Sequence, residues 1–174
     1  MAGVIVNFLT SDVTGLPGSI GMMAAPGVNR DLDRDLDALR EKHNASMLIT
    51  LVGDHEIEFL RLTDLRERAA ARGIEALRFP ITDGSVPTSM EACIDLVRRI
   101  LAELEQGRTI LVHCWAGLGR TGLLAACCLV ARGFDPGEAI TAVRRCRPRT
   151  IEYTEQEEFV FAFANEWAAR RRSP

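Results

Sequence analysis

One cysteine and one arginine, separated by five residues, have the spacing that points most directly to chemistry. Cys114 follows the apolar segment 109–113, and a helix is expected to begin near Arg120. The residues between them are Trp115, Ala116, Gly117, Leu118 and Gly119. The two glycines permit backbone conformations that other residues resist, so the turn can direct successive N–H groups inward. Such a nest at a helix N-terminus binds an anion.

The chemistry that this loop predicts is the transfer of a phosphoryl group to sulfur. Arg120 carries a planar guanidinium that can bond two phosphate oxygens at once. An ordinary cysteine has a pKa of about 8.5, and helix N-termini and nearby cations lower such values by several units. We therefore expect Cys114 to be a thiolate that attacks phosphorus, with the Thr121 hydroxyl steadying the sulfur when it leaves. His113 is expected to orient the loop through hydrogen bonds rather than to act as a base.

A cysteine after a strand is more often a small buried apolar residue than a nucleophile. The Cys-x5-Arg spacing with two interior glycines, between a strand and a helix, is much rarer and favours the functional interpretation. The other cysteines fit the ordinary pattern, since Cys127 and Cys128 lie in an apolar run and Cys93 lies on an apolar helical face. A regulatory disulfide from one of them to Cys114 is an alternative, because thiols of low pKa oxidise readily.

The composition of the chain limits the class of protein to which this loop can belong. The chain has 174 residues, 47% of them hydrophobic, which is enough for one substantial core and a single domain over 1–174. Its 21 basic and 24 acidic residues leave a net charge of −3, which argues against a nucleic-acid binder. Five cysteines without a CxxC pair indicate neither a disulfide scaffold nor a zinc site. No apolar stretch reaches the length of a membrane span, so we expect a cytoplasmic protein that does not bind membranes.

Strand-like and helix-like segments alternate along the chain. The predicted strands are 4–9, 47–52, 76–81 and 109–113, and a short apolar piece, 20–23, lies between two turns. The predicted helices are 30–43, 57–71, 88–105, 120–133 and 135–146, with a last one from 154. This alternation favours an α/β domain with a central, mostly parallel sheet of about five strands and helices on both faces. Ligands of such sheets bind beyond the carboxyl ends of strands, where the loops at Cys114, Asp83 and Asp54 are expected.

These residues also carry a family resemblance. The stretch His113-Cys-x-x-Gly-x-x-Arg-Thr121 resembles the signature of the protein tyrosine and dual-specificity phosphatase superfamily. Its Ala-Gly-Leu-Gly-Arg core is most similar to the branch with the cyclin-dependent-kinase-associated and Cdc14-like phosphatases. Leu16-Pro-Gly18, Pro26-Gly27 and Pro80-Ile-Thr-Asp-Gly-Ser-Val-Pro87 look like segments of the same branch. Together the similarities run from about residue 15 to residue 163.

The resemblance implies a dual-specificity phosphatase-like fold, a reaction and further site residues. The reaction is the hydrolysis of phosphoprotein monoesters in two steps through a phosphocysteine, without a metal or another cofactor. Asp83 is then the general acid that protonates the departing oxygen and later activates water, which Gln156 positions. Ordinary alternatives stay open, since Asp-Gly is a common turn pair and Gln156 fits a solvated helix. Asp54 and His55, at a neighbouring strand end, are reserve candidates for the acid.

Substrate choice stays open between several classes. The loop holds no lysine, whereas related inositol-lipid phosphatases usually place lysines there, so a phosphorylated protein or peptide is the favoured substrate. An inositol-phosphate or phosphoinositide phosphatase is the main alternative, and a module that binds phosphoproteins without hydrolysing them is another. A rhodanese-like sulfurtransferase or an arsenate reductase fits less well, because low-molecular-weight phosphatases and related reductases carry this loop near the N-terminus. Trp115 is expected in the pocket wall or beneath it.

Four arginines gather at the end of the predicted helix 135–146, namely Arg144, Arg145, Arg147 and Arg149. Cations are favoured at a helix C-terminus, which is the ordinary interpretation. The alternative is that they face acidic residues beside the phosphorylated residue. In that case neutralising Arg147 and Arg149 raises KM for acidic phosphopeptides but not for a small aryl phosphate. The oligomeric state does not follow from the sequence.

Overall fold

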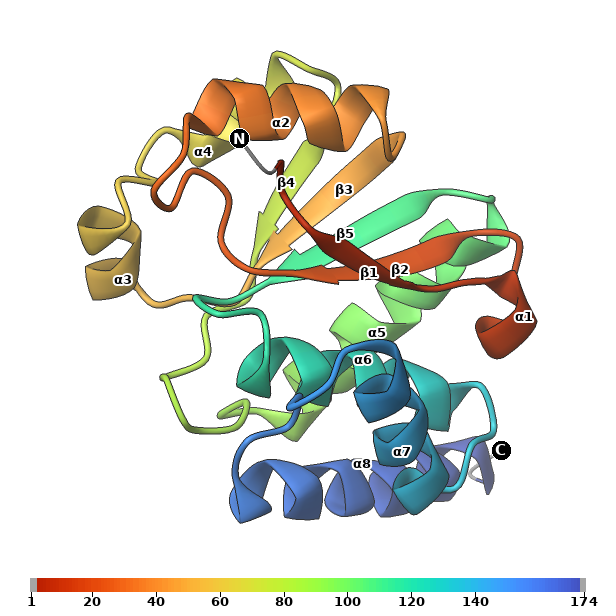
Figure 1. Ribbon diagram of the computed structural model, residues 1–174. Coiled ribbons are helices and arrows are strands. Elements are labelled where there is room, and N and C mark those ends of the chain that lie inside the picture. The colour runs from red at the N-terminus through yellow and green to blue at the C-terminus, as the bar shows by residue number, and fades with distance from the viewer. Residues whose placement is uncertain (1–2, 173–174) are drawn as a thin grey trace.

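The computed structural model describes residues 3–172 and shows one α/β domain built on a five-stranded sheet (Figure 1). The strands are β1 (Val6–Leu9), β2 (Ser19–Met23), β3 (Ala45–Thr50), β4 (Glu75–Arg78) and β5 (Thr109–His113). Their order is β1-β2-β5-β3-β4, with β1 antiparallel to β2 and every other neighbouring pair parallel. This confirms the predicted fold class, with the segment 20–23 inside β2. The predicted range 1–174 includes two residues at each end that lie outside the described part.

Helices cover both faces of the sheet. They are α1 (Ser11–Thr14), α2 (Leu32–Glu41), α3 (Asp54–Phe59), α4 (Leu65–Ala70), α5 (Met90–Glu105), α6 (Gly119–Ala131), α7 (Pro136–Cys146) and α8 (Thr154–Arg172). α2 and α4 contact β3 and β4 and lie above the sheet in Figure 1, whereas α5, α6, α7 and α8 form the layer below it. Every residue of α6 is buried, because α5, α7 and α8 surround it, and its sequence is accordingly apolar on nearly all sides.

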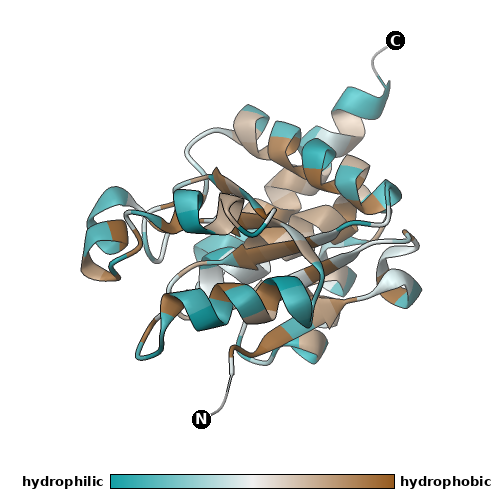
Figure 2. Cartoon of the chain, turned by 90° about the horizontal axis from the view of Figure 1, so that it is seen from above, coloured by the Kyte–Doolittle hydropathy of each residue, from teal (hydrophilic) through white to brown (hydrophobic). Residues whose placement is uncertain are grey.

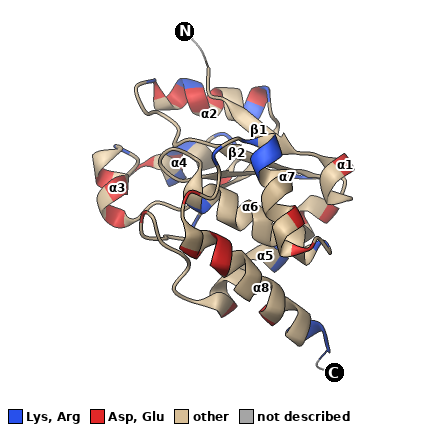
Figure 3. Cartoon of the chain, turned by 60° about the horizontal axis from the view of Figure 1, so that its bottom comes forward, with Lys and Arg blue, Asp and Glu red and all other residues tan. Residues whose placement is uncertain are grey.

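The centre of the sheet is apolar and covered on both faces. The runs Met47-Leu-Ile49 in β3 and Ile110-Leu-Val112 in β5 are buried, as expected of parallel strands between two helical layers. In Figure 2 the central strands are brown, whereas α2 alternates between teal and brown because only one of its sides faces the sheet. The outer side of α2 carries the alternating acidic and basic residues that Figure 3 shows in red and blue.

The predicted helix 57–71 is wrong, because the two short helices α3 and α4 occupy this region. Between them Arg61 adopts a left-handed backbone conformation, with φ of 56°, which a continuous α-helix excludes. α3 also starts earlier than expected. The Glu56 carboxylate accepts a hydrogen bond of 2.9 Å from the Gly53 N–H, a donor near the helix start that lacks an intrahelical partner. The leucines of the linking segment are buried, so apolar spacing alone does not reveal the break.

All four parallel strands end at the same edge of the sheet. Met23 in β2 and Thr50 in β3 each pair with His113, the last residue of β5, and Thr50 also pairs with Arg78, the last residue of β4. The loops that follow these strands therefore meet beyond that edge, where open α/β sheets bind ligands. These loops are the turn 24–31, the segment 51–53 with α3 after it, the segment 79–89 and the loop 114–118.

Candidate active site

The loop after β5 is held from outside by its carbonyl groups, beginning with those of Cys114 and Trp115. The Cys114 carbonyl accepts a hydrogen bond of 3.0 Å from His113 Nδ1. The Trp115 carbonyl accepts one of 2.9 Å from the N–H of Ala25, in the turn after β2. The first half of the loop is thereby fixed to the strand ends on which it sits.

The next two carbonyl groups are held by a single side chain. Arg147, directly after α7, donates from Nη2 to the Ala116 carbonyl at 3.0 Å and from Nε to the Gly117 carbonyl at 2.7 Å. The guanidinium is a planar fork, so it fixes both peptide units in one orientation. Arg147 therefore supports the phosphate loop from its outer side.

The last carbonyl of the loop, that of Leu118, accepts hydrogen bonds from the N–H groups of Gly122 (2.9 Å) and Ile151 (3.2 Å). A trans peptide unit sets its N–H opposite to its C=O, and no peptide bond within residues 3–172 is cis. The N–H groups of residues 115–119 therefore point away from the outer partners, toward the inside of the loop. Among the described residues, none of the N–H groups of residues 115–118 donates a hydrogen bond, which leaves them available to an anion.

The two glycines of the loop are required for different reasons. Gly117 has a φ of +70°, and a Cβ atom there would lie 2.1 Å from the Met23 carbonyl oxygen. Gly119 has no left-handed conformation, so the expected conformational role is wrong at this position. A Cβ atom at Gly119 would instead lie 2.8 Å from Glu152 Oε2 and 3.0 Å from the Gln156 amide, so the lack of a side chain makes room for these two residues.

His113 orients the loop in one tautomer. Its Nδ1 faces the Cys114 carbonyl, which can only accept, so Nδ1 carries the proton. Its Nε2 then accepts a hydrogen bond of 2.8 Å from the Thr50 hydroxyl. Burial lowers the pKa of His113 to about 4, with the nearby Arg120 charge adding to the effect. The imidazole is therefore neutral at physiological pH and already uses both nitrogens, as expected of an orienting residue.

Cys114 is buried at the floor of a pocket of about 170 Å³. The hydroxyl of Thr121, on the first turn of α6, is buried and finds no hydrogen-bond partner within residues 3–172. A buried hydroxyl without a partner costs about 1–3 kcal/mol. The expected hydrogen bond from Thr121 to the Cys114 sulfur is not formed in this structure.

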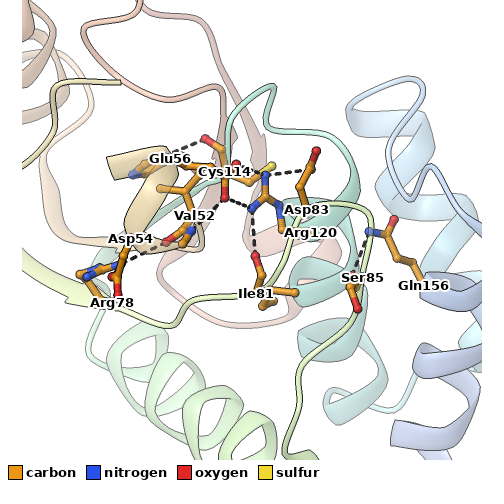
Figure 4. A network of polar contacts seen from close by, with 12 residues as sticks. Val52, Asp54, Glu56, Arg78, Ile81, Asp83, Ser85, Cys114, Arg120 and Gln156 are labelled. Carbon is orange, nitrogen blue, oxygen red and sulfur yellow. Dashed lines mark hydrogen bonds and ion pairs between the residues drawn. The ribbon is translucent and has the colours of Figure 1, made fainter. Parts of the chain in front are cut away.

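Arg120 is 2% exposed and lies at the centre of a network of polar contacts (Figure 4). Both of its Nη groups donate to the Glu56 carboxylate, each at 2.7 Å. Nη1 also donates to the Ile81 carbonyl at 2.9 Å, and Nη2 donates to Asp83 Oδ1 at 3.0 Å. Burial alone would lower the pKa of Arg120, but the Glu56 hydrogen bonds and the neighbouring acidic groups raise it. The guanidinium is therefore a fixed cation beside the loop.

Glu56 is a site residue that sequence reasoning missed. Burial raises the pKa of this carboxyl, but hydrogen bonds from Arg120 and from the Gly53 N–H outweigh that effect and bring the pKa below its ordinary value. The neighbouring reserve candidates lie elsewhere, since Asp54 is exposed and pairs with Arg78 at 2.9 Å, and His55 is exposed and lines no part of the Cys114 pocket. The signal for Glu56 was its place in an acidic loop after a buried strand.

The walls of the pocket include several predicted residues. They are Asp83, Trp115, Ala116, Arg120 and Gln156, together with Glu152 and Tyr153, which sequence reasoning missed. Trp115 was expected either in the pocket wall or beneath it. It lies in the wall and is 40% exposed, so it does not pack beneath the loop. Asp83 lies above the pocket with its side chain 76% exposed, so its carboxylate can reach a ligand.

Gln156 is buried, which excludes the solvated-helix alternative. Its Nε2 donates to the Ser85 carbonyl at 3.2 Å, and its Oε1 accepts from the Glu152 N–H at 3.1 Å. The amide therefore connects the segment that carries Asp83 to the start of α8. This contact holds the Asp83 segment beside the pocket.

Two of the four clustered arginines make structural contacts, whereas Arg145 and Arg149 are exposed. Arg144 donates to the carbonyls of Thr150 and Ile151 and pairs with Glu157, while Arg147 holds the phosphate loop. These guanidinium groups are occupied by the protein itself. An effect of Arg147 on acidic phosphopeptides alone therefore does not follow from the geometry.

The remaining cysteines of α5 and α6 belong to the core. Burial raises the pKa of Cys127, whose side chain also contacts that of Cys93, and burial likewise raises the pKa of Cys128. All five cysteines of the chain are free thiols in this structure, so no disulfide joins any of them to Cys114.

Within residues 3–172 no group of three or more His, Cys, Asp or Glu side chains is arranged to hold a metal ion. Over the same residues no helix combines the length and the apolar character needed to cross a bilayer.

Known proteins are similar to this chain in sequence. The model of the family described as "Polymorphic toxin system, DSP-PTPase phosphatase" matches residues 20–134. The cyclin-dependent kinase inhibitor 3 of Rattus norvegicus is 27% identical over 158 residues, which cover 86% of this chain and 74% of the relative. The dual specificity protein phosphatase CDC14A of Homo sapiens is 36% identical over 113 residues, which cover 64% of this chain and 17% of the relative.

Solved structures share the fold. A kinase associated phosphatase with its catalytic-site cysteine replaced by serine has a TM-score of 0.89 at 24% identity, covering 97% of this chain and 98% of that chain. PTPMT1 in complex with PI(5)P has a TM-score of 0.76 at 25% identity, covering 87% and 94%. The family match spans well over half of the chain. The chain therefore belongs to the DSP-PTPase phosphatase family and is a cysteine-dependent phosphoric monoester hydrolase of the tyrosine and dual-specificity superfamily, near its kinase-associated and Cdc14 branch.

Proposed function

We propose that this phosphatase hydrolyses phosphoprotein monoesters through a phosphocysteine intermediate on Cys114. The observation that carries the proposal is the outward anchoring of all five carbonyl groups from Cys114 to Leu118. It leaves the N–H groups of residues 115–119 for the phosphate oxygens, with the Arg120 charge beside them. An anion is bound best where preorganised N–H groups and a buried cation converge.

In the first step the Cys114 sulfur attacks the phosphorus. An S–P bond forms, the bond from phosphorus to the substrate oxygen breaks, and Asp83 gives that oxygen a proton. In the second step a water oxygen attacks the phosphorus and gives a proton to Asp83, and the S–P bond breaks to return thiolate and inorganic phosphate. Gln156 positions this water. Thr121 Oγ1, which has no partner within residues 3–172, donates to the departing sulfur.

Phosphate binding has to rearrange the contacts of Arg120. Glu56, Ile81 and Asp83 take the four hydrogens on Nη1 and Nη2, while Nε donates to no other described residue. A phosphate held by two hydrogen bonds therefore engages Nε and the Nη2 hydrogen that now faces Asp83. The Asp83 side chain is largely exposed, and exposed ion pairs contribute at most about 1 kcal/mol, so a bound dianion displaces it. The substrate's own phosphate thus releases the acid toward the leaving oxygen.

A phosphoprotein fits the pocket better than an inositol polyphosphate. The pocket offers one guanidinium, that of Arg120, and its lining contains no lysine. The carboxylates of Asp83 and Glu152 also line it, so a second phosphate group would meet negative charge. PTPMT1, whose structure holds PI(5)P, has the same fold, which makes a phosphoinositide the alternative substrate to include in an assay.

The reaction is tested with para-nitrophenyl phosphate in the presence of EDTA. Wild-type protein should hydrolyse it and be inhibited by vanadate, and Cys114→Ser should lose the activity. Cys146→Ser, at a half-buried cysteine outside the pocket, is the matched control and should keep it. Asp83→Asn should slow hydrolysis of a phosphopeptide by roughly 10²–10⁴-fold and that of an activated aryl ester less. Undiminished hydrolysis by Cys114→Ser would rule out the chemistry.

The substrate class is tested with wild-type protein on phosphopeptides, inositol phosphates and phosphoinositide vesicles. A higher kcat/KM on phosphopeptides supports the proposal, and a higher value on either inositol substrate replaces it. Tight binding of phosphopeptides with no turnover by the wild-type protein would indicate a binding module instead.

A further inference from the structure

A larger cavity adjoins the phosphate pocket and shares a wall with it. It has a volume of about 740 Å³ and is lined by Trp115, by residues 59–61 at the end of α3, and by the turn Gly27–Asp31 after β2. Trp115 also lines the pocket that contains Cys114. A ligand whose phosphate lies on the Cys114 loop can therefore continue into this cavity. Its size is within the range of roughly 300–1,000 Å³ that ligand sites occupy.

The shared wall, Trp115, belongs to an exposed aromatic pair. Phe59 is 72% exposed, and its ring centroid lies 5.2 Å from that of Trp115. Phe59 is the last residue of α3, which projects from the side of the molecule in Figure 1. Two large apolar side chains left in contact with water favour an apolar partner that covers them.

The cavity also offers one unpaired cation. Arg30 is committed to an ion pair of 3.0 Å with Asp35, and the Asp31 carboxylate caps α2 by accepting from the Arg34 N–H. Arg61 is exposed and makes no side-chain hydrogen bond or ion pair with any residue from 3 to 172. A negatively charged group of a ligand would meet this guanidinium.

A lipid surface is a poor occupant of this cavity. The helix that carries Phe59 also carries Asp54, Glu56 and Glu58, the acidic residues that colour α3 red in Figure 3. Asp54 and Glu56 are paired with arginines, but an anionic bilayer would repel the exposed Glu58 carboxylate as the aromatic pair approached it. A peptide can place an apolar and an acidic side chain in separate positions and avoids this repulsion.

We propose that the cavity of Phe59, Trp115 and Arg61 binds the segment of the substrate protein that flanks the phosphorylated residue. An apolar side chain of that segment packs against the aromatic pair, and an acidic one lies beside Arg61. The inference rests on the proposed function, because the phosphorylated residue itself occupies the Cys114 pocket. It names the substrate class as phosphoproteins with apolar and acidic residues next to the phosphate.

The test compares two phosphotyrosine peptides, one with leucine and glutamate on each side of the phosphotyrosine and one with glycine and serine. Each kcat/KM is divided by that for para-nitrophenyl phosphate, so that damage to the catalytic loop cancels. Wild-type protein should prefer the first peptide. Phe59→Ala should reduce this preference by about tenfold, the scale of one lost aromatic contact. Arg61→Gln should reduce it by about threefold, the scale of one exposed ion pair.

Phe161→Ala is the matched control, because Phe161 is an exposed phenylalanine on α8 that lines neither cavity. It should keep the wild-type preference. An unchanged preference in Phe59→Ala, or an equal loss in Phe161→Ala, overturns the inference. A loss of activity in Phe59→Ala that is larger on phosphoinositide vesicles than on peptides also overturns it and points to a lipid surface.

The result that would refute this inference differs from the result that would refute the proposed function. If wild-type protein fails to hydrolyse para-nitrophenyl phosphate, or if Cys114→Ser still hydrolyses it, the proposed function falls and the peptide site falls with it. If hydrolysis depends on Cys114 but the two peptides react equally, the chemistry stands and only the cavity has been assigned wrongly.

Discussion

Replacing Glu56 by glutamine tests whether phosphate transfer depends on a carboxylate that does not line the Cys114 pocket. Arg120 donates both Nη groups to Glu56 at 2.7 Å, and the two side chains are 2% and 16% exposed. Glutamine keeps the shape but presents one oxygen and one nitrogen that cannot accept. Arg120 would then remain charged and buried, with one hydrogen bond to the neutral glutamine in place of the two to the Glu56 carboxylate, beside its contacts with Ile81 and the exposed Asp83.

Two effects of this change oppose each other, and their sizes decide the outcome. Breaking a buried ion pair costs about 3–5 kcal/mol, and the remaining Asp83 contact places the Glu56→Gln protein near the lower end. A guanidinium displaced by about 1 Å costs roughly a hundredfold in rate, or about 2.7 kcal/mol. In the opposite direction, removing the Glu56 charge removes its repulsion of the bound phosphate. This strengthens phosphate binding by about 1 kcal/mol per phosphate charge at water-like screening. Misplacement of Arg120 is the larger effect, so kcat/KM should fall.

Chemical unfolding and para-nitrophenyl phosphate hydrolysis measure the two losses. We expect Glu56→Gln to lose about 3 kcal/mol of unfolding free energy, a fall of roughly 6–12 °C in Tm, and about a hundredfold in kcat/KM. The matched control is Glu58→Gln, the same charge change at an exposed position of α3, which should alter neither quantity. If Glu56→Gln kept the wild-type rate, or exceeded it, the argument that this carboxylate fixes Arg120 would be refuted.

The loss of stability should also depend on pH in a known direction. The pKa of Glu56 in the folded protein is lowered, so the unfolded chain binds its proton more readily. The stabilisation is therefore present above the unfolded value of about 4.3 and is lost as pH falls through the lower folded value. The difference between wild-type and Glu56→Gln proteins should be constant near neutral pH and shrink below about pH 4.

Three further changes test the scaffold of the loop. Gly117→Ala should abolish most activity, because its Cβ would clash with the Met23 carbonyl, whereas Gly73→Ala, with φ of +71° and open space, should cost only about 1–2 kcal/mol of stability. Arg147→Met should lower kcat/KM equally for a small aryl phosphate and for acidic phosphopeptides, and a loss confined to the acidic peptides would contradict the anchoring role. His113 has a folded pKa of about 4, so wild-type protein should lose about 1.6 kcal/mol of stability between pH 6.5 and pH 5, as its unfolded chain takes up a proton. In His113→Asn that part of the pH dependence, measured by urea unfolding, should be absent.

The parts of the molecule that could be predicted from sequence are those whose causes are local. The loop from Cys114 to Arg120 spans seven residues, and its turn depends on Gly117 within it. The strand 109–113 and the helix that follows were recognisable because both are almost entirely buried, and the runs 110–112 and 122–131 are therefore apolar. The alternation of strands and helices led to the correct fold class for the same reason.

The missed residues depend on contacts between distant parts of the chain. Glu56 lies 64 residues before Arg120, and Arg147 lies 30 residues after Gly117. Successive helical residues turn by about 100°, so positions 54 and 56 face directions about 200° apart and only one of them can meet Arg120. Since α3 starts at Asp54 rather than after it, Glu56 takes that place and Asp54 turns outward to Arg78.

The difference between local causes and contacts of distant residues also explains why the sequence predicted the reaction and left the substrate class open. The anion site that we propose is made of backbone N–H groups, and their direction is set by anchors on the far side of the loop, so the side chains at Trp115, Ala116 and Leu118 have little part in it. These side chains are free to vary without loss of the nest. Specificity therefore belongs to groups such as Trp115 that extend outward and meet another element, here Phe59 at the end of α3. A signature read along one loop reports the chemistry, whereas the choice of substrate depends on which distant side chains the sheet edge brings beside it.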